Sequence, residues 1–126
     1  MIVNVPVSVG ELIDKITILE IKSIKIKNTI KNAEVKKELK HLKKILKINK
    51  IRINKFKTDY LKLKKINERL WNIENKKRRA EAKKIFDDNF IRLARNVYLF
   101  NDKRAQYKLN INMITNSEII EVKSHE

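Results

Sequence analysis

The 126-residue sequence has no cysteine, one glycine and one proline. Without cysteine it can form no disulfide, no thiolate zinc site and no cysteine nucleophile. A single glycine cannot build a glycine-rich phosphate loop, and it leaves a many-stranded fold short of turn residues. His41 and His125 are the only histidines, which is too few for a histidine-built metal centre. We therefore expect no metal or other cofactor, and the composition favours a small helical protein.

Long apolar runs are also missing. No run approaches the eighteen or so apolar residues that a membrane-spanning helix needs. The N-terminal segment lacks the basic region and the long apolar region of a signal peptide. We therefore predict a cytoplasmic protein, and the length predicts a single domain over residues 1–126.

Positive charge is abundant and unevenly distributed. The chain has 31 Lys and Arg against 15 Asp and Glu, a net charge of +16, and residues 22–65 carry 17 of the basic and 3 of the acidic residues. Such a segment attracts polyanions, either nucleic acid or an anionic surface. The candidate contacts for a polyanion are Lys36, Lys40, Lys43, Lys44 and Lys47.

The alternative is a solvated lysine-rich helix surface. The chain has 24 Lys, 20 Ile and 14 Asn, which is typical of an AT-rich genome. Arg52 is the only arginine in residues 22–65, and base recognition usually relies on arginine and on stacking aromatic groups. Nucleic acid is therefore a less favoured partner than a protein.

Local signals predict where the helices begin. Pro6 keeps the preceding residue extended, and Ser8 with Glu11 forms a capping box at the start of a first helix that ends near residues 28–31. An unbroken seven-residue apolar period favours one long helix over residues 33–84, with a break at residues 48–54 as the alternative. A last helix begins at Asp87 or Asp88 and ends near Thr115.

These elements predict an all-α antiparallel coiled-coil bundle, with three helices or, if the long one is broken, four. Because the ends of the chain then meet, residues 2–5 and 119–122 are expected to pair as a short two-stranded β element. If the helix over residues 33–84 is unbroken, the chain forms two-helix hairpins that bury too little apolar surface to be stable alone. We therefore expect a homodimer. Asn49 and Asn67 could fix its register or simply face solvent.

Four segments carry a resemblance to a known family. They are VPVSVGELIDKITILEIK at residues 5–22, NERLWNIE at residues 67–74, LARNVY with NDKRA at residues 93–105, and EVKS at residues 121–124. The chain resembles a small bacterial family of unknown function, in which some members lie beside genes for glycosyltransferases or surface polysaccharide. The sequence has His125 where that family more often has tyrosine. The resemblance implies no established activity.

The same segments place polar residues on helix faces that should be apolar. The candidate ligand-binding or interaction residues are Asp14, Lys15, Asn67, Trp71, Glu74, Arg95, Tyr98, Asn101 and Arg104. They could line a polar cleft, in which Arg95 and Arg104 hold an anion and an aromatic ring stacks on it. The alternative is a structural ion-pair network at a helix junction.

Three functions follow from these patterns. The favoured one is a non-enzymatic interaction or accessory protein, and the resemblance implies service to cell-surface polysaccharide enzymes. The second is polyanion binding through residues 22–65. The third is a small helical enzyme that acts on an anionic metabolite, because Ile13-Asp14-Lys15-Ile16 is loosely similar to the first helix of the all-helical chorismate mutases.

Overall fold

The computed structural model describes residues 1–123, and this part of the chain contains four α-helices, one short 3-10 helix and no strand. The elements are α1 (Val9–Lys25), α2 (Thr29–Ile48), η1 (Ile53–Phe56), α3 (Lys57–Ala82) and α4 (Asp88–Ile114). The all-α prediction is confirmed for these residues.

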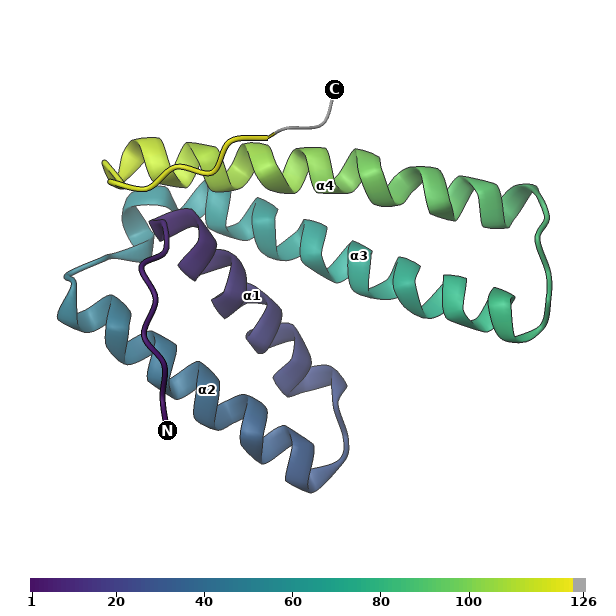
Figure 1. The fold of residues 1–126 in the computed structure, drawn as a ribbon, viewed down its shortest axis with the longest axis horizontal. Coiled ribbons are helices and arrows are strands. Elements are labelled where there is room, and N and C mark those ends of the chain that lie inside the picture. The colour runs from purple at the N-terminus through teal and green to yellow at the C-terminus, as the bar shows by residue number, and fades with distance from the viewer. Residues whose placement is uncertain (124–126) are drawn as a thin grey trace.

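The helices form two hairpins that meet near one end of the molecule and diverge toward the other (Figure 1). α1 pairs with α2 and α3 pairs with α4. α1 joins the two hairpins, because its backbone packs against those of α2, α3 and α4. The backbone of α2 lies close to no described helix other than α1.

The apolar core lies where the hairpins meet. Its buried members come from all five elements: Leu12, Ile13, Ile16, Leu46, Phe56, Leu63 and Ile111. Burial of one such side chain stabilises the fold by about 1.5–3 kcal/mol, so stability is concentrated at this meeting point. Between residues 68 and 110 of α3 and α4, by contrast, Ile73 is the only fully buried side chain.

The predicted continuous helix over residues 33–84 is wrong, and the alternative of a break at residues 48–54 is correct. α2 ends at Ile48, and Lys50 adopts a left-handed conformation with φ of 55°. The backbone N–H of Ile51 then donates to the carbonyl of Leu46 at 2.9 Å, which closes the helix end. The reversal brings Leu46 and Phe56 into the same core.

The first helix is shorter than predicted, and the second begins earlier. α1 ends at Lys25, and Asn28 caps α2 by accepting from the backbone N–H of Lys31 at 3.0 Å. Asn32 Nδ2 donates to the carbonyls of Ser23 at 2.7 Å and Ile26 at 3.0 Å. These bonds hold the turn between α1 and α2 closed.

The predicted pairing of residues 2–5 with residues 119–122 is not observed. From the start of α1, the N-terminal segment follows the groove between α1 and α2, whereas the C-terminal segment turns back along α4 (Figure 1). The two segments therefore diverge and cannot form a ladder. They still meet through side chains, because Ser8 Oγ donates to the carboxylate of Glu121. Ser124 and His125 lie outside the described residues.

The start and end of the last helix agree with the prediction. Asp87 caps α4 by accepting from the backbone N–H of Phe90 at 3.0 Å, and Thr115 is the C-cap.

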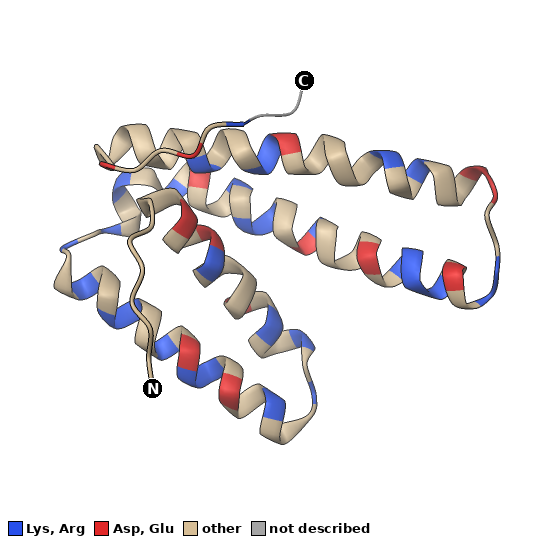
Figure 2. Cartoon of the chain, in the orientation of Figure 1, with Lys and Arg blue, Asp and Glu red and all other residues tan. Residues whose placement is uncertain are grey.

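None of the described helices is both long enough and apolar enough to cross a membrane. Figure 2 shows the basic residues spread along α2 and the start of α3.

Candidate functional site

The only glycine of the chain lies where α1 approaches α4 most closely. A Cβ atom on Gly10 would lie 2.4 Å from the carbonyl oxygen of Lys108 and 2.8 Å from Oδ1 of Asn112. The backbone N–H of Gly10, which has no partner inside α1 because it lies in the first turn, donates to that same Oδ1 at 2.6 Å. Residue 10 must therefore lack a side chain for α1 to start here.

A buried polar cluster joins α1, α3 and α4, and we call Asp14, Thr17, Asn67 and Arg104 the polar junction. The Asp14 carboxylate is completely buried. It accepts hydrogen bonds from Arg104 Nε at 2.9 Å and from Arg104 Nη2. This two-point contact fixes orientation as well as distance. The hydrogen bonds to Asp14 raise the pKa of Arg104, although burial acts in the opposite direction.

Asn67 and Thr17 complete the polar junction. Asn67 Nδ2 donates to Asp14 Oδ1 and to Thr17 Oγ1, both at 2.9 Å. The Thr17 hydroxyl donates to the backbone carbonyl of Asp14 at 2.8 Å. Within residues 1–123, every buried side-chain nitrogen and oxygen has a hydrogen-bond partner. The amide of Asn67 is thus used inside the protomer, whereas Asn49 is exposed and caps α2 through the carbonyl of Ile45.

A second polar cluster surrounds the start of α1. The buried Ser8 hydroxyl accepts from the backbone N–H of Glu11 at 3.0 Å and donates to Glu121. Glu121 also accepts from Asn112 Nδ2 at 2.9 Å, and Lys108 forms an ion pair with Glu11. The C-terminal segment is therefore held to the beginning of the first helix.

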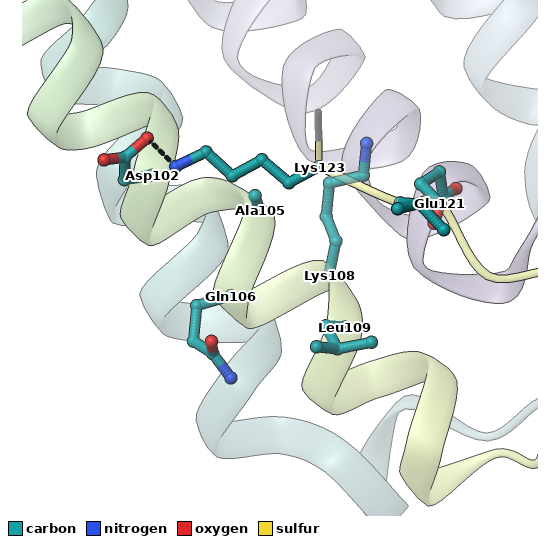
Figure 3. Close-up of a pocket in the computed structure, with 8 residues that line it drawn as sticks. Asp102, Ala105, Gln106, Lys108, Leu109, Glu121 and Lys123 are labelled. Atoms are coloured by element: carbon teal, nitrogen blue, oxygen red, sulfur yellow. Dashed lines mark hydrogen bonds and ion pairs between the residues drawn. The ribbon is translucent and has the colours of Figure 1, made fainter. Parts of the chain in front are cut away.

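Figure 3 shows how the C-terminal segment crosses α4. Lys123 forms an ion pair with Asp102, and Glu121 and Lys123 line a pocket of about 440 Å³ with residues of α4. Burial alone would raise the pKa of Glu121. Hydrogen bonds from Ser8 and Asn112 and the charge of Lys108 outweigh burial, so the pKa of Glu121 is lowered.

A third contact ties the end of α1 to the start of α3. The Tyr60 hydroxyl donates to Glu20 Oε1 at 2.5 Å, and Lys64 Nζ lies 3.7 Å from Glu20 Oε2. Burial of Tyr60, with the hydrogen bond to Glu20 and the negative charge of Glu20, raises the pKa of Tyr60.

The structure brings together three of the nine candidate residues of the predicted cleft, namely Asp14, Asn67 and Arg104. Asn101 lies beside them at the surface and accepts a 3.5 Å bond from Arg104 Nη1. Arg95 is exposed and lies nine residues before Arg104, about 14 Å along α4 and on the opposite side of the helix. The two arginines therefore do not converge on one anion.

The other four candidates lie apart from the polar junction. Lys15 is exposed and lies 4.0 Å from Glu38 of α2, and Glu74 lies 3.5 Å from Lys77 one turn further along α3. Trp71 is half-buried and Tyr98 is 54% exposed. Both aromatic rings are therefore at least partly accessible to solvent.

The five candidate lysines for polyanion binding are all exposed along α2: Lys36, Lys40, Lys43, Lys44 and Lys47. None of the five takes part in an ion pair within the described residues. Lys40 and Lys44 also border a groove of about 770 Å³ between α1, α2 and the N-terminal segment. The lysines thus form a continuous cationic face.

The chemistry available at the polar junction is limited. Its carboxylate is buried and its guanidinium group, although partly exposed, already binds that carboxylate through Nε and Nη2. Among residues 1–123, no group of three His, Cys, Asp or Glu side chains is placed to hold a metal ion. The geometry favours the structural ion-pair network over the ligand-binding cleft.

Sequence patterns did not indicate four positions of these polar clusters, namely Gly10, Thr17, Asn112 and Glu121. One signal could have paired α1 with α4: Glu11 and Asp14 are three residues apart, and their partners Lys108 and Arg104 are four residues apart in the reverse order. Such matching intervals of opposite charge indicate two antiparallel helices. Asn112 and Glu121 show no comparable signal.

Comparisons with known proteins give a family but no characterised relative. No curated protein matches the chain, and no solved structure matches it. The sequence profile of one family, described as a family of unknown function (DUF6165), matches residues 3–126. Because the match covers nearly the whole sequence, the chain belongs to this family of unknown function.

Proposed function

We propose that the protein is a non-enzymatic helical interaction protein that acts as a homodimer. The observation that carries this proposal is the exposed surface of the protomer, 9498 Å². A compact protein of 15.0 kDa is expected to expose about 7,000 Å². The excess of about 2,500 Å² is of the size that each subunit of an obligate dimer buries.

Apolar side chains mark where the contact would form. The outer half of the α3–α4 hairpin exposes Ile85, Phe86, Ile91, Tyr98 and Leu99, each by at least 42%. Ile91 and Tyr98 are seven residues apart and therefore lie on one side of α4. A seven-residue spacing suits a coiled-coil contact with a second copy.

The dimer is tested by light scattering after size-exclusion chromatography. We expect a mass near 30 kDa, twice the 15.0 kDa of one chain, and a monomer for the variant Ile91→Lys/Tyr98→Lys. Asn75→Lys, an exposed change on α3, is the control and should remain dimeric. A wild-type protein that stays monomeric at high concentration contradicts the dimer.

The accessory role extends this proposal to a second protein. The family resemblance points to surface-polysaccharide enzymes, and the half-buried Trp71 is an accessible aromatic anchor of the kind that dominates interfaces. The test is binding of the purified chain to a polysaccharide enzyme encoded beside it. Trp71→Ala should weaken that binding at least tenfold. If the variant binds as tightly as the wild type, Trp71 is not part of the interface.

Polyanion binding is a second candidate, and the unpaired lysine face of α2 favours it. For each lysine that contacts a DNA phosphate, the logarithm of the binding constant falls by about 0.9 for every tenfold rise in salt concentration. Changing Lys40, Lys43, Lys44 and Lys47 to Glu should abolish binding to heparin or DNA. The same change in charge at the exposed residues Lys76, Lys83, Lys84 and Lys103 is the control. Equal loss with both variants would mean that net charge alone drives the binding.

A further inference from the structure

The solvent-facing side of α2 carries apolar side chains as well as lysines. Ile30 and Ile48 are 78% and 77% exposed. They are five helical turns apart, so they lie on the same line along α2. Lys37 and Lys44 stand between them close to that line, and both are exposed. The outer face of α2 thus carries Lys37 and Lys44, with His41 and Glu34 beside them, between an isoleucine at each end.

The N-terminal segment adds two apolar side chains at the edge of this face. Ile2 and Val3 are 68% and 75% exposed, and they line the same groove as Lys37 and Lys44. In Figure 1 this segment crosses beside α2, at the outer margin of the molecule and away from the α3–α4 hairpin. The α3–α4 hairpin does not cover this face, because the backbone of α2 lies close to no described helix other than α1.

Acidic side chains on this side are few. Glu34 and Glu38 line the groove, and Glu38 lies 4.0 Å from Lys15. The lysines outnumber them, and the stretch that contains α2 carries most of the net charge of +16. The face therefore attracts an anionic partner.

The isoleucines distinguish between the two anionic partners that the charge alone would allow. Contacts to nucleic-acid phosphates need cations, and contacts to bases use arginine or stacked aromatic rings. Exposed isoleucines serve neither purpose. A bilayer surface, however, presents negative headgroups directly above hydrocarbon, and helices that lie in this interface combine lysines with inserted apolar side chains.

We propose that α2, with residues 2–3, binds the surface of an anionic lipid bilayer. The lysines contact headgroup phosphates, and their long stems run along the interface. The side chains of Ile2, Val3, Ile30 and Ile48 enter the outermost part of the hydrocarbon. This proposal rests on the polyanion binding proposed above and names the anion as a lipid surface.

The test is cosedimentation of the full chain with vesicles. We expect binding to phosphatidylglycerol–phosphatidylcholine vesicles and no binding to vesicles of phosphatidylcholine alone. Lys37→Gln/Lys44→Gln should weaken binding about fivefold for each lysine at low salt. Binding to both vesicle types alike would overturn the proposal, because the lysines would then have no role.

The decisive variant is Ile30→Ser/Ile48→Ser, which leaves every charge in place. Both side chains are exposed, so the fold should be unchanged, as circular dichroism can verify. We expect vesicle binding to weaken at least tenfold and heparin binding to stay the same. Leu61→Ser/Met113→Ser, at exposed positions of α3 and α4 that belong to neither proposed surface, is the control and should bind vesicles like the wild type.

Insertion can be read independently from fluorescence. In a Trp71→Phe background, Ile48→Trp places the only tryptophan on the α2 face, and its emission should shift to the blue with anionic vesicles. An unshifted emission, or vesicle binding by the double serine variant that equals the wild type, overturns the membrane proposal. If the chain binds heparin or DNA but not vesicles, the membrane proposal is overturned and polyanion binding stands. If it binds neither heparin, nor DNA, nor vesicles, both proposals are overturned.

Discussion

Arg104 holds the completely buried carboxylate of Asp14 through both Nε and Nη2, and this contact joins positions 90 residues apart in the sequence. Because α1 carries Asp14 and α4 carries Arg104, the pair fixes how the two hairpins meet. The guanidinium group satisfies a charge that has no access to water. The buried carboxylate therefore depends on Arg104 in the folded protein.

Removing the guanidinium group should be strongly destabilising. Arg104→Ala leaves the Asp14 carboxylate buried without its cation, and we expect the free energy of unfolding to fall by about 3–5 kcal/mol. Denaturant titration followed by circular dichroism measures this change. Arg95→Ala, at an exposed position on the same helix, should change stability by less than about 0.5 kcal/mol.

Replacing both partners tests whether the cost comes from the orphaned charge. Asp14→Leu/Arg104→Met removes both charges and keeps similar volume, so it should recover most of the stability lost in Arg104→Ala. A double variant that is less stable than Arg104→Ala would instead show that the polar junction contributes net stability.

Gly10→Ala should weaken the contact between α1 and α4. The added Cβ would lie 2.4 Å from a backbone carbonyl, which a side-chain rotation cannot relieve, so we expect a loss of about 1–3 kcal/mol. The variant Gly10→Ala/Asn112→Ala removes the second clash but keeps the one with the carbonyl. It should therefore not restore stability in thermal or denaturant unfolding.

The attachment of the C-terminal segment should depend on pH. The pKa of Glu121 is lowered in the folded protein from its ordinary value of 4.5, so its ionised form stabilises the fold above that pH. This contribution is lost as the pH falls through the folded-state pKa. The melting temperatures of wild type and Glu121→Gln should thus differ at neutral pH and converge as the pH falls below 4.5.

The contact between Tyr60 and Glu20 should fail at alkaline pH. The pKa of Tyr60 is raised above 10.0 in the folded protein, so its stabilising effect is present below pH 10.0 and lost as the pH rises further. Absorbance at the tyrosinate band should show one late ionising step that is missing in Tyr60→Phe. Glu20→Gln should move that step to lower pH, and an unmoved step would contradict the assigned cause.

Local sequence signals predicted the parts of the fold that local contacts decide. Ser8 caps α1 and Asp87 caps α4 as expected, because a capping side chain acts on residues two or three positions away. The break after α2 was not preferred, since the apolar period runs through it and no glycine marks it. Lys50 adopts the left-handed conformation there because Leu46 and Phe56 must reach one core, which is a long-range requirement.

The candidate site was predicted in part for the same reason. The faces of single helices indicated Asp14, Asn67 and Arg104, since polar residues on an apolar seam are visible in the sequence. The pairing of these residues depends on how helices cross, which no periodicity gives. The cleft with Arg95 was not found, because Arg95 and Arg104 lie on opposite sides of α4. Asn112 was missed because its partner Gly10 lies at the opposite end of the chain.

The backbone of α2 lies close to that of α1 alone among the described helices, and this position affects how the sequence can change over generations. A substitution on the outer face of α2 disturbs no other described helix, so it should change the stability of the fold only slightly. A genome biased toward A and T can therefore accumulate lysine and isoleucine codons in this helix, whereas a change of Gly10 or Asp14 in α1 would disturb the fold. The helix whose outer face can change most freely, α2, is thus also the one that can acquire a new binding surface.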